Sequence, residues 1–198
     1  MVTDPRLERL AAALRRRPHE DLPRLPVYRE AGVALVLRPG DGFELLLIKR
    51  AEQEGDPWSG HMALPGGRRE PGDADLRATA ARETREETGI ALATRGRFLG
   101  PLDEVAPVSR RLPPYVIAPF VAAVPAGTEA IPEPREVAAA LWVPLAALRQ
   151  DHAVSEILVE LGGDTRSFPS LRIGEHEIWG LTHRILTGFL DIAAECGL

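Results

Sequence analysis

The chain has 198 residues, of which 44% are hydrophobic and 27% are charged, so it is long enough for one substantial core with an additional arm. A formal net charge of −5 lacks the basic character of nucleic-acid-binding proteins, so we expect no nucleic-acid partner. The single cysteine, Cys196, excludes an internal disulfide framework, and no apolar run is long enough to span a bilayer. We therefore expect a cytoplasmic protein without membrane association.

The first predicted element is a short amphipathic helix between Asp4 and Pro18. Asp4 is a suitable N-cap, Pro5 fits the first helical position, and Pro18 cannot continue the helix. A proline-rich segment follows, which we expect to lie across the rest of the molecule. We therefore predict a helical arm over residues 1–28 and one main domain over residues 29–198.

The main domain begins with two strand-like runs within residues 31–50, and the turn sequence PGDG between them favours a β-hairpin. Residues 51–73 form a long segment rich in glycine and proline, and a loop of this length in a compact domain is usually functional. A helix is predicted from about Asp75 to Thr88, with Gly89 in the position after its last turn.

The second half of the chain predicts further strands and two more helices. Three β-like runs are followed by a short helix, a segment compatible with a hairpin, and a C-terminal amphipathic helix; they cover residues 94–102, 115–124, 137–145, 144–150, 162–177 and 179–195, respectively. Strands mixed with a central and a C-terminal helix predict one α/β or α+β sandwich.

The central helix concentrates negative charge on one face. Glu83, Glu86 and Glu87 lie three and four residues apart, so a helix brings their carboxylates together although like charges repel. This pattern also fits a solvated surface helix in which Arg82 and Arg85 offset the repulsion.

The preceding sequence LPGGRREPGD favours the functional interpretation of these carboxylates. Its two consecutive glycines, Gly66 and Gly67, allow the backbone to approach a ligand and to direct a carbonyl oxygen toward it. Carboxylate and carbonyl oxygens suit Mg²⁺ or Mn²⁺, and such ions bind phosphates and activate water. Hydrolysis of a phosphoanhydride is therefore the chemistry that this pattern indicates.

The stretch GGRREPGDADLRATAARETREETGI resembles the Nudix box, G-x5-E-x7-R-E-U-x-E-E-x-G-U, where U is an aliphatic residue. It departs from the box in two ways. Asp73 stands in place of the first glutamate, with eight residues instead of seven before Arg82, and Thr84 replaces an aliphatic residue. The sequence leaves open whether Asp73 is a partner of Arg82 or a cap near the start of the helix.

The resemblance implies a Nudix-like α/β/α sandwich with a mixed sheet, in addition to the N-terminal helical arm. It implies that Glu83, Glu86 and Glu87, with the carbonyl of Gly66 or Gly67, bind Mg²⁺ or Mn²⁺. Glu83 or a carboxylate from another loop, for which Glu136 is the candidate, would accept the proton from water. Arg82 would orient Glu83.

The segments LLLIKRA, YVIAPFVA and IWGLTHRIL, together with the form of the box, are similar to the coenzyme A pyrophosphatase branch of the family. That similarity implies cleavage of coenzyme A or acyl-CoA to 3′,5′-ADP and 4′-phosphopantetheine. Guanidinium groups suit phosphates, so the candidate substrate-binding residues are Arg50, Arg68, Arg110 and Arg111.

Three alternatives stay open from the sequence. The first is a Nudix hydrolase of ADP-ribose, of another nucleoside diphosphate derivative or of an oxidised nucleotide. The second is a Nudix-fold binding module without catalysis, although such modules usually lose glutamates of the box. The third concerns assembly, since the sequence is compatible with a homodimer as well as with a monomer.

Overall fold

The computed structural model describes residues 4–24, 27–55, 58–107, 114–161 and 164–198. Its helices are α1 (Pro5–Arg16), α2 (Leu76–Thr88), α3 (Leu92–Arg95), α4 (Leu145–Leu148) and α5 (Gly180–Glu195), with one 3₁₀ turn, η1 (Asp151–Ala153). Its strands are β1 (Arg29–Gly40), β2 (Gly42–Arg50), β3 (Met62–Ala63), β4 (Gly66–Arg68), β5 (Arg97–Pro101), β6 (Tyr115–Ala123), β7 (Val137–Pro144), β8 (Val154–Leu161), β9 (Asp164–Ile173) and β10 (His176–Trp179).

The strands form two sheets. The larger sheet has the order β3-β2-β1-β6-β5, with β4 paired to β1 and β7 paired to β2. Strands β1 and β6 run parallel, whereas the other pairs in this sheet are antiparallel, so the sheet is mixed. The smaller sheet is antiparallel, with the order β10-β9-β8. The predicted hairpin is β1–β2, and Gly42 has the positive φ of 91° that its turn requires.

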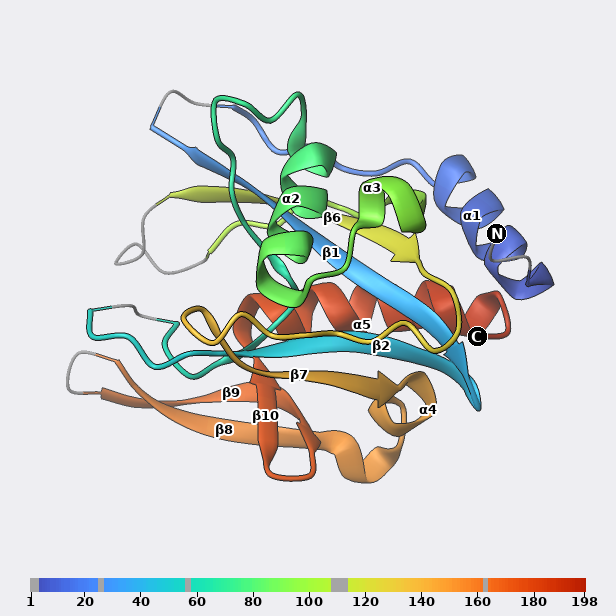
Figure 1. The fold of residues 1–198 in the computed structure, drawn as a ribbon. Coiled ribbons are helices and arrows are strands. Elements are labelled where there is room, and N and C mark those ends of the chain that lie inside the picture. Colours follow the sequence, from blue (N-terminus) through green and yellow to red (C-terminus); the bar gives the residue numbers. More distant parts are fainter. Residues whose placement is uncertain (1–3, 25–26, 56–57, 108–113, 162–163) are drawn as a thin grey trace.

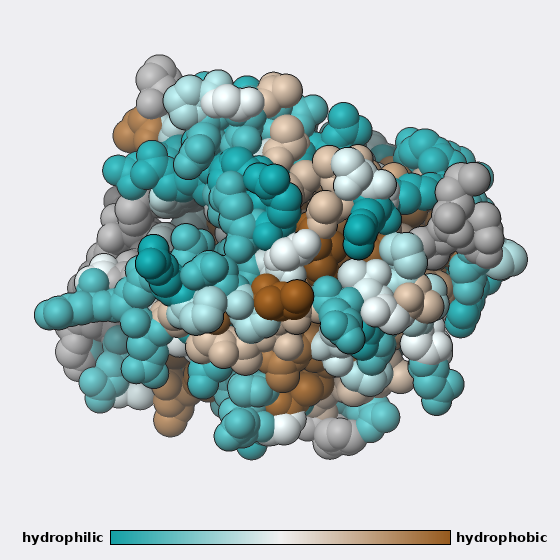
Figure 2. Space-filling model, in the orientation of Figure 1, coloured by the Kyte–Doolittle hydropathy of each residue, from teal (hydrophilic) through white to brown (hydrophobic). Residues whose placement is uncertain are grey.

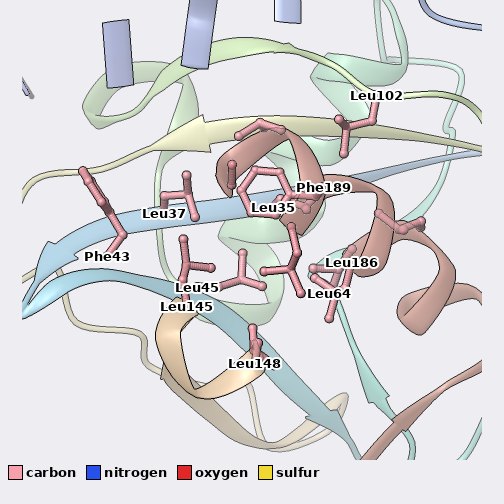
Figure 3. Close-up of a cluster of buried hydrophobic side chains, with 14 of the residues drawn as sticks. Leu35, Leu37, Phe43, Leu45, Leu64, Leu102, Leu145, Leu148, Leu186 and Phe189 are labelled. Atoms are coloured by element: carbon pink, nitrogen blue, oxygen red, sulfur yellow. The ribbon is translucent and has the colours of Figure 1, made fainter. Parts of the chain in front are cut away.

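The larger sheet lies between two helical layers (Figure 1), with α2 and α3 on one face and α5 on the other. Alternate residues of β1 point to opposite faces: Leu35 and Leu37 join the cluster that contains α5, whereas Val36 joins the cluster that contains residues of α2. The larger cluster includes Leu145, Leu186 and Phe189 (Figure 3). The predicted α/β/α sandwich with a mixed sheet is thus confirmed.

Helix α1 has the predicted caps and packs against the same core. The side chain of Asp4 accepts a hydrogen bond from the backbone nitrogen of Arg6, and the helix ends two residues before Pro18. Four apolar residues spaced three or four apart are at most 2% exposed and belong to the larger cluster: Leu7, Leu10, Ala11 and Leu14. The division of the chain at residue 28 stays a prediction, and the apolar face of α1 contributes to the core of the predicted main domain.

Helix α2 packs unusually close to β1. Asp75 caps its first turn by accepting a hydrogen bond from Ala78, and Gly89 ends it in the left-handed conformation, as predicted. At Gly32 on β1, an added Cβ atom would lie 2.1 Å from the carbonyl oxygen of Leu76 in α2. The helix can approach the sheet at this point only because Gly32 has no side chain.

Three features of the fold differ from the sequence-based expectations. The segment 51–73, expected to be a loop, contains the short strands β3 and β4, and α3 occupies the start of the run 94–102. The eight-residue strand β8 was not predicted. Val154 and Leu158 on β8 are 72% and 71% exposed, whereas Ile157 and Val159 on its other face are half-buried, and the strand pairs with β9 along its length.

The surface of the molecule in the same view is mostly hydrophilic around α2, with separate apolar patches (Figure 2). No helix among the described residues has the length and the apolar character needed to cross a membrane.

Replacing Gly32 by alanine tests the close packing of α2 on β1. The added methyl group meets the backbone of α2, which cannot move aside like a flexible side chain, so we expect Gly32→Ala to destabilise the protein by about 3 kcal/mol. The matched control is Gly188→Ala in α5, where an added Cβ atom would meet nothing within 4 Å. Urea denaturation of both variants checks this, and equal stabilities of the two would contradict the close packing.

Candidate active site

The carboxylates of α2 face the backbone of β4. Strand β4 pairs with β1 through Gly66–Val33 and Gly67–Gly32, and this pairing places the two glycines beside α2. The backbone nitrogen of Gly66 donates a hydrogen bond of 2.8 Å to Glu87 Oε2. At Gly67 an added Cβ atom would lie 2.5 Å from the carboxylate carbon of Glu83, so any side chain there would displace this carboxylate. The glycine pair and the glutamates therefore meet as the sequence suggested.

Arg82 is the central cation of this region. Its guanidinium lies 2.9 Å from a carboxylate oxygen of Glu83 and 2.8 Å from one of Glu86. It also donates a hydrogen bond of 2.9 Å to the carbonyl oxygen of Arg68 on β4. The guanidinium offers five donors in a rigid plane, whereas a lysine ammonium has three donors and no planar arrangement to match these fixed acceptors.

Asp73 is a partner of Arg82, which resolves the two alternatives that the sequence left open. Its carboxylate accepts hydrogen bonds of 3.0 and 3.1 Å from Arg82, and others from the backbone of Glu70 and the hydroxyl of Thr79. The hydrogen bonds from Arg82 lower the pKa of Asp73 to about 2. The capping function at the start of α2 belongs to Asp75 instead.

Burial dominates the electrostatics of the two inner glutamates. Glu87 is 3% exposed, and loss of hydration raises the pKa of its carboxyl group to about 8. Burial also raises the pKa of Glu83, and the negative charge of Glu136 raises the pKa of both groups further. The exposed residue Glu136, which precedes β7, is therefore close enough to act on the same carboxylates.

This set of donors fits a hard divalent cation. Buried carboxylates of like charge are stabilised by a positive ion, and Gly67 leaves the space beside Glu83 free of a side chain. Within the described ranges, no three acidic, histidine or cysteine side chains already converge on one point as metal ligands. The ion pairs with Arg82 involve one carboxylate oxygen of Glu83 and one of Glu86.

The other predicted residues differ in their relation to this site. Arg50, at the end of β2, lies near the glutamates, because its charge lowers the pKa of Glu87. The side chain of Arg68 is exposed, and its carbonyl group is what contacts Arg82. Arg110 and Arg111 lie outside the described residues.

Two aromatic contacts involve Trp58 and Trp179. The rings of Trp58 and Tyr115 meet edge to face with centroids 6.1 Å apart, and those of His61 and Trp179 do so at 5.0 Å. His61 therefore packs against an aromatic ring.

Glu30 and Arg69 also contact the loop before α2, and sequence reasoning did not identify them. Arg69 bonds to the carboxylate of Glu30 and to two carbonyl groups of that loop. These two residues are 39 positions apart, and no local spacing pattern connects them.

The raised pKa of Glu87 predicts how metal-free protein responds to pH. The pKa of Glu87 in the folded protein is about 8, above the usual value of 4.5, so between these pH values the folded state binds the proton and the unfolded state does not. Protonation of Glu87 therefore stabilises the folded state at low pH, and this contribution to the free energy of unfolding is lost as pH rises from 4.5 through 8. In EDTA, wild type should lose up to about 1.4 kcal/mol per pH unit across this range relative to Glu87→Gln, which cannot ionise. Urea denaturation of both proteins at several pH values measures the difference, and parallel profiles would contradict a raised pKa.

Comparison with known proteins relates this geometry to a family. The model of the NUDIX domain matches residues 28–160. An uncharacterized protein of Schizosaccharomyces pombe is 39% identical over 119 residues, which cover 59% of this chain and 36% of that protein. The human mitochondrial coenzyme A diphosphatase NUDT8 is 31% identical over 153 residues, which cover 76% of this chain and 63% of that protein. The chain thus aligns with less than two thirds of the length of each of these relatives.

A solved structure supports the same assignment at the level of the fold. The crystal structure of a MutT/nudix family protein from Enterococcus faecalis superposes with a TM-score of 0.55 at 16% identity, covering 97% of this chain and 76% of that one. The match of the domain model extends over the sheet, the glycine pair and the carboxylate helix described above. The chain belongs to the Nudix hydrolase family.

Proposed function

We propose that the protein is a Mg²⁺- or Mn²⁺-dependent pyrophosphohydrolase that cleaves the diphosphate of coenzyme A or acyl-CoA to 3′,5′-ADP and 4′-phosphopantetheine. The observation that carries the hydrolase function is the placement of the buried Glu87 and the half-buried Glu83 against Gly66 and Gly67. Nudix hydrolases generally use divalent metal ions and act on nucleoside diphosphate derivatives. The choice of coenzyme A is supported by the branch-like segments of the sequence and by the human relative named for that activity.

In this proposal Glu83, Glu86, Glu87 and the carbonyl group of Gly67 hold the cation. A bound Mg²⁺ would neutralise the charge of the diphosphate and increase the acidity of water. Arg82 has a positioning role, because it contacts Glu83, Glu86 and the anchored Asp73 at the same time. Because Asp73 fixes the guanidinium of Arg82, Arg82 in turn fixes the orientation of the carboxylates of Glu83 and Glu86.

A carboxylate must accept the proton from the attacking water. Glu83 is the first candidate, since burial raises its pKa and makes it a stronger base than an exposed glutamate. Glu136 is the second candidate, because its charge acts on Glu83 and Glu87 although it comes from a different loop.

Phosphate recognition is proposed for four arginines, as the sequence suggested. The charge of Arg50 acts on Glu87, and Arg68, at the end of β4, has an exposed side chain. Arg110 and Arg111, in the sequence between Pro107 and Pro114, are the proposed contacts to the 3′-phosphate of coenzyme A. A cytoplasmic location and a homodimer as an alternative to the monomer belong to the same proposal.

Conservative substitutions on α2 test the proposed roles of its charged residues. Glu86→Gln or Glu87→Gln should lower kcat by about two orders of magnitude or more, because a carboxylate ligand is lost while the shape is kept. Arg82→Lys keeps the charge but loses the planar group, so it should lower kcat by about tenfold. Steady-state kinetics with Mg²⁺ measures these changes, with melting temperature in EDTA as the control for folding. Full activity of Glu87→Gln, or of wild type in EDTA, would exclude the metal-dependent mechanism.

The substrate is tested by comparing kcat/KM for coenzyme A, dephospho-coenzyme A and ADP-ribose under one metal condition. Dephospho-coenzyme A lacks the 3′-phosphate, so it should lose about 1.5–3 kcal/mol if an arginine makes a charge-assisted hydrogen bond to that group. An advantage of ADP-ribose over coenzyme A of about tenfold or more, which is about 1.4 kcal/mol, would refute the coenzyme A assignment but leave the diphosphate chemistry intact.

A further inference from the structure

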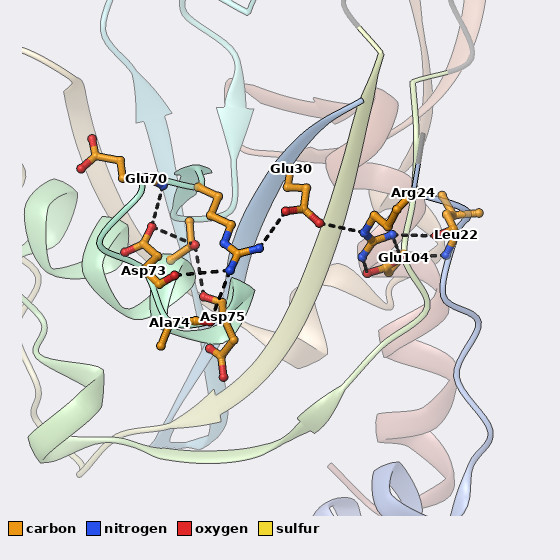
Figure 4. Close-up of polar contacts among 10 residues, drawn as sticks. Leu22, Arg24, Glu30, Glu70, Asp73, Ala74, Asp75 and Glu104 are labelled. Carbon is orange, nitrogen blue, oxygen red and sulfur yellow. Dashed lines mark hydrogen bonds and ion pairs between the residues drawn. The ribbon is translucent and has the colours of Figure 1, made fainter. Parts of the chain in front are cut away.

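A chain of ion pairs connects the N-terminal arm to the loop that precedes α2 (Figure 4). Glu30, on β1, lies at its centre and accepts hydrogen bonds from Arg24 at 2.8 Å and from Arg69 at 2.9 Å, one on each carboxylate oxygen. We call residues 69–75 the box loop. Arg69 continues the pairing of β4 with β1, since its backbone nitrogen donates a hydrogen bond of 2.9 Å to the carbonyl oxygen of Glu30.

At the arm end of this series of ion pairs, Arg24 is held by several hydrogen bonds. Arg24 also bonds to both carboxylate oxygens of Glu104, which is 8% exposed, and to the carbonyl oxygen of Leu22. The backbone nitrogen of Leu22 in turn donates a hydrogen bond of 2.7 Å to the carboxylate of Glu104. Glu30 is therefore held in place from the side opposite to Arg69, and it can serve as a fixed point for the box loop.

Two arginines hold the box loop from different sides. Arg69 reaches its C-terminal end, where Nη2 donates to the carbonyl oxygens of Asp73 and Ala74 at 3.4 and 3.3 Å. Arg82 holds the carboxylate of the same Asp73, and it also contacts Glu83 and Glu86. Asp73 is thus shared, through its backbone by Arg69 and through its side chain by Arg82.

We propose that Arg69 is a positioning residue, which uses its bond to Glu30 to fix Asp73 and thereby sets how Arg82 presents Glu83 and Glu86. This proposal rests on the proposed function. The stability of α2 alone does not account for Arg69, because a positive charge near the N-terminus of a helix opposes the helix dipole. Its contacts to two successive carbonyl groups account for it as a clamp on the box loop.

The chain offers a closely matched control. Arg97 on β5 forms a two-point ion pair with Glu8 on α1, and its side chain is 38% exposed, compared with 39% for Arg69. Arg97→Gln therefore removes a surface ion pair of the same kind outside the box loop. Any difference between Arg69→Gln and Arg97→Gln reports on the position of Arg69 and not on the loss of an ion pair as such.

The experiment compares wild type, Arg69→Gln, Arg69→Lys and Arg97→Gln. We expect Arg69→Gln to lower kcat and to weaken Mn²⁺ binding, followed by electron paramagnetic resonance, by about tenfold each, with KM changed by less than about twofold. Arg69→Lys keeps the contact to Glu30 but cannot also span both carbonyl groups, so it should restore about a third of the loss. Arg97→Gln should change each quantity by less than about twofold.

A double variant tests whether Arg69 acts through Arg82. In the Arg82→Lys background, Arg69→Gln should lower kcat by less than about threefold, because the route through Arg82 is already impaired. Equal effects of Arg69→Gln and Arg97→Gln on kcat and on Mn²⁺ binding, with similar losses of melting temperature, would overturn the proposal. If wild type cleaves none of the tested substrates, the proposed function fails, and the Mn²⁺ comparison still decides the role of Arg69. If Arg69→Gln does not fold, the Arg69→Lys comparison decides it in the same way.

Discussion

The confinement of negative charge on α2 is the constraint from which the rest of the site follows. Glu87 is buried and Glu83 is partly buried, and the charge of Glu83 raises the pKa of Glu87 beyond the effect of burial. A folded chain tolerates this arrangement only if cations or proton uptake offset it. Arg82 supplies the permanent positive charge, and its bonds to Asp73 fix the direction from which it does so.

The close approach of backbones follows from the same constraint. Gly32 brings α2 within van der Waals distance of β1, while Gly66 and Gly67 bring β4 against the carboxylates. A larger residue at Gly32 would push α2 away from the sheet and let water reach the glutamates, whereas a side chain at Gly67 would displace the carboxylate of Glu83. Hydration would remove the energetic reason for a cation to bind there, so the glycines determine the chemistry of the site as well as its shape.

The features that the sequence predicted are those set by neighbours along the chain. The start of α2 near Asp75, its end at Gly89, the turn at Gly42 and the shared face of the glutamates all depend on spacings of four residues or fewer. Strand β8 could not be predicted because apolar and polar residues do not alternate regularly in its sequence, although its side chains alternate between exposed and half-buried once it pairs with β9. The sequence could not decide the role of Asp73, because its ion pair with Arg82 joins a loop residue to a helix residue nine positions away and depends on how the loop folds back onto α2.

The ion pairs around Glu30 show why positioning contacts are harder to read from sequence than ligands. A metal ligand is recognised by residue type and local spacing, whereas Arg69, Glu30, Arg24 and Glu104 are ordinary surface charges in the sequence and become a network only when β1, the arm and the box loop meet. Single exposed ion pairs contribute little to the free energy of unfolding. The effect of this network is therefore positional, because Glu30 is shared by Arg24 and Arg69, and Arg24 is shared by Glu30 and Glu104. Because Glu30 belongs to the strand that also carries Gly32, one strand fixes both the distance of α2 from the sheet and the position of the loop that leads into it.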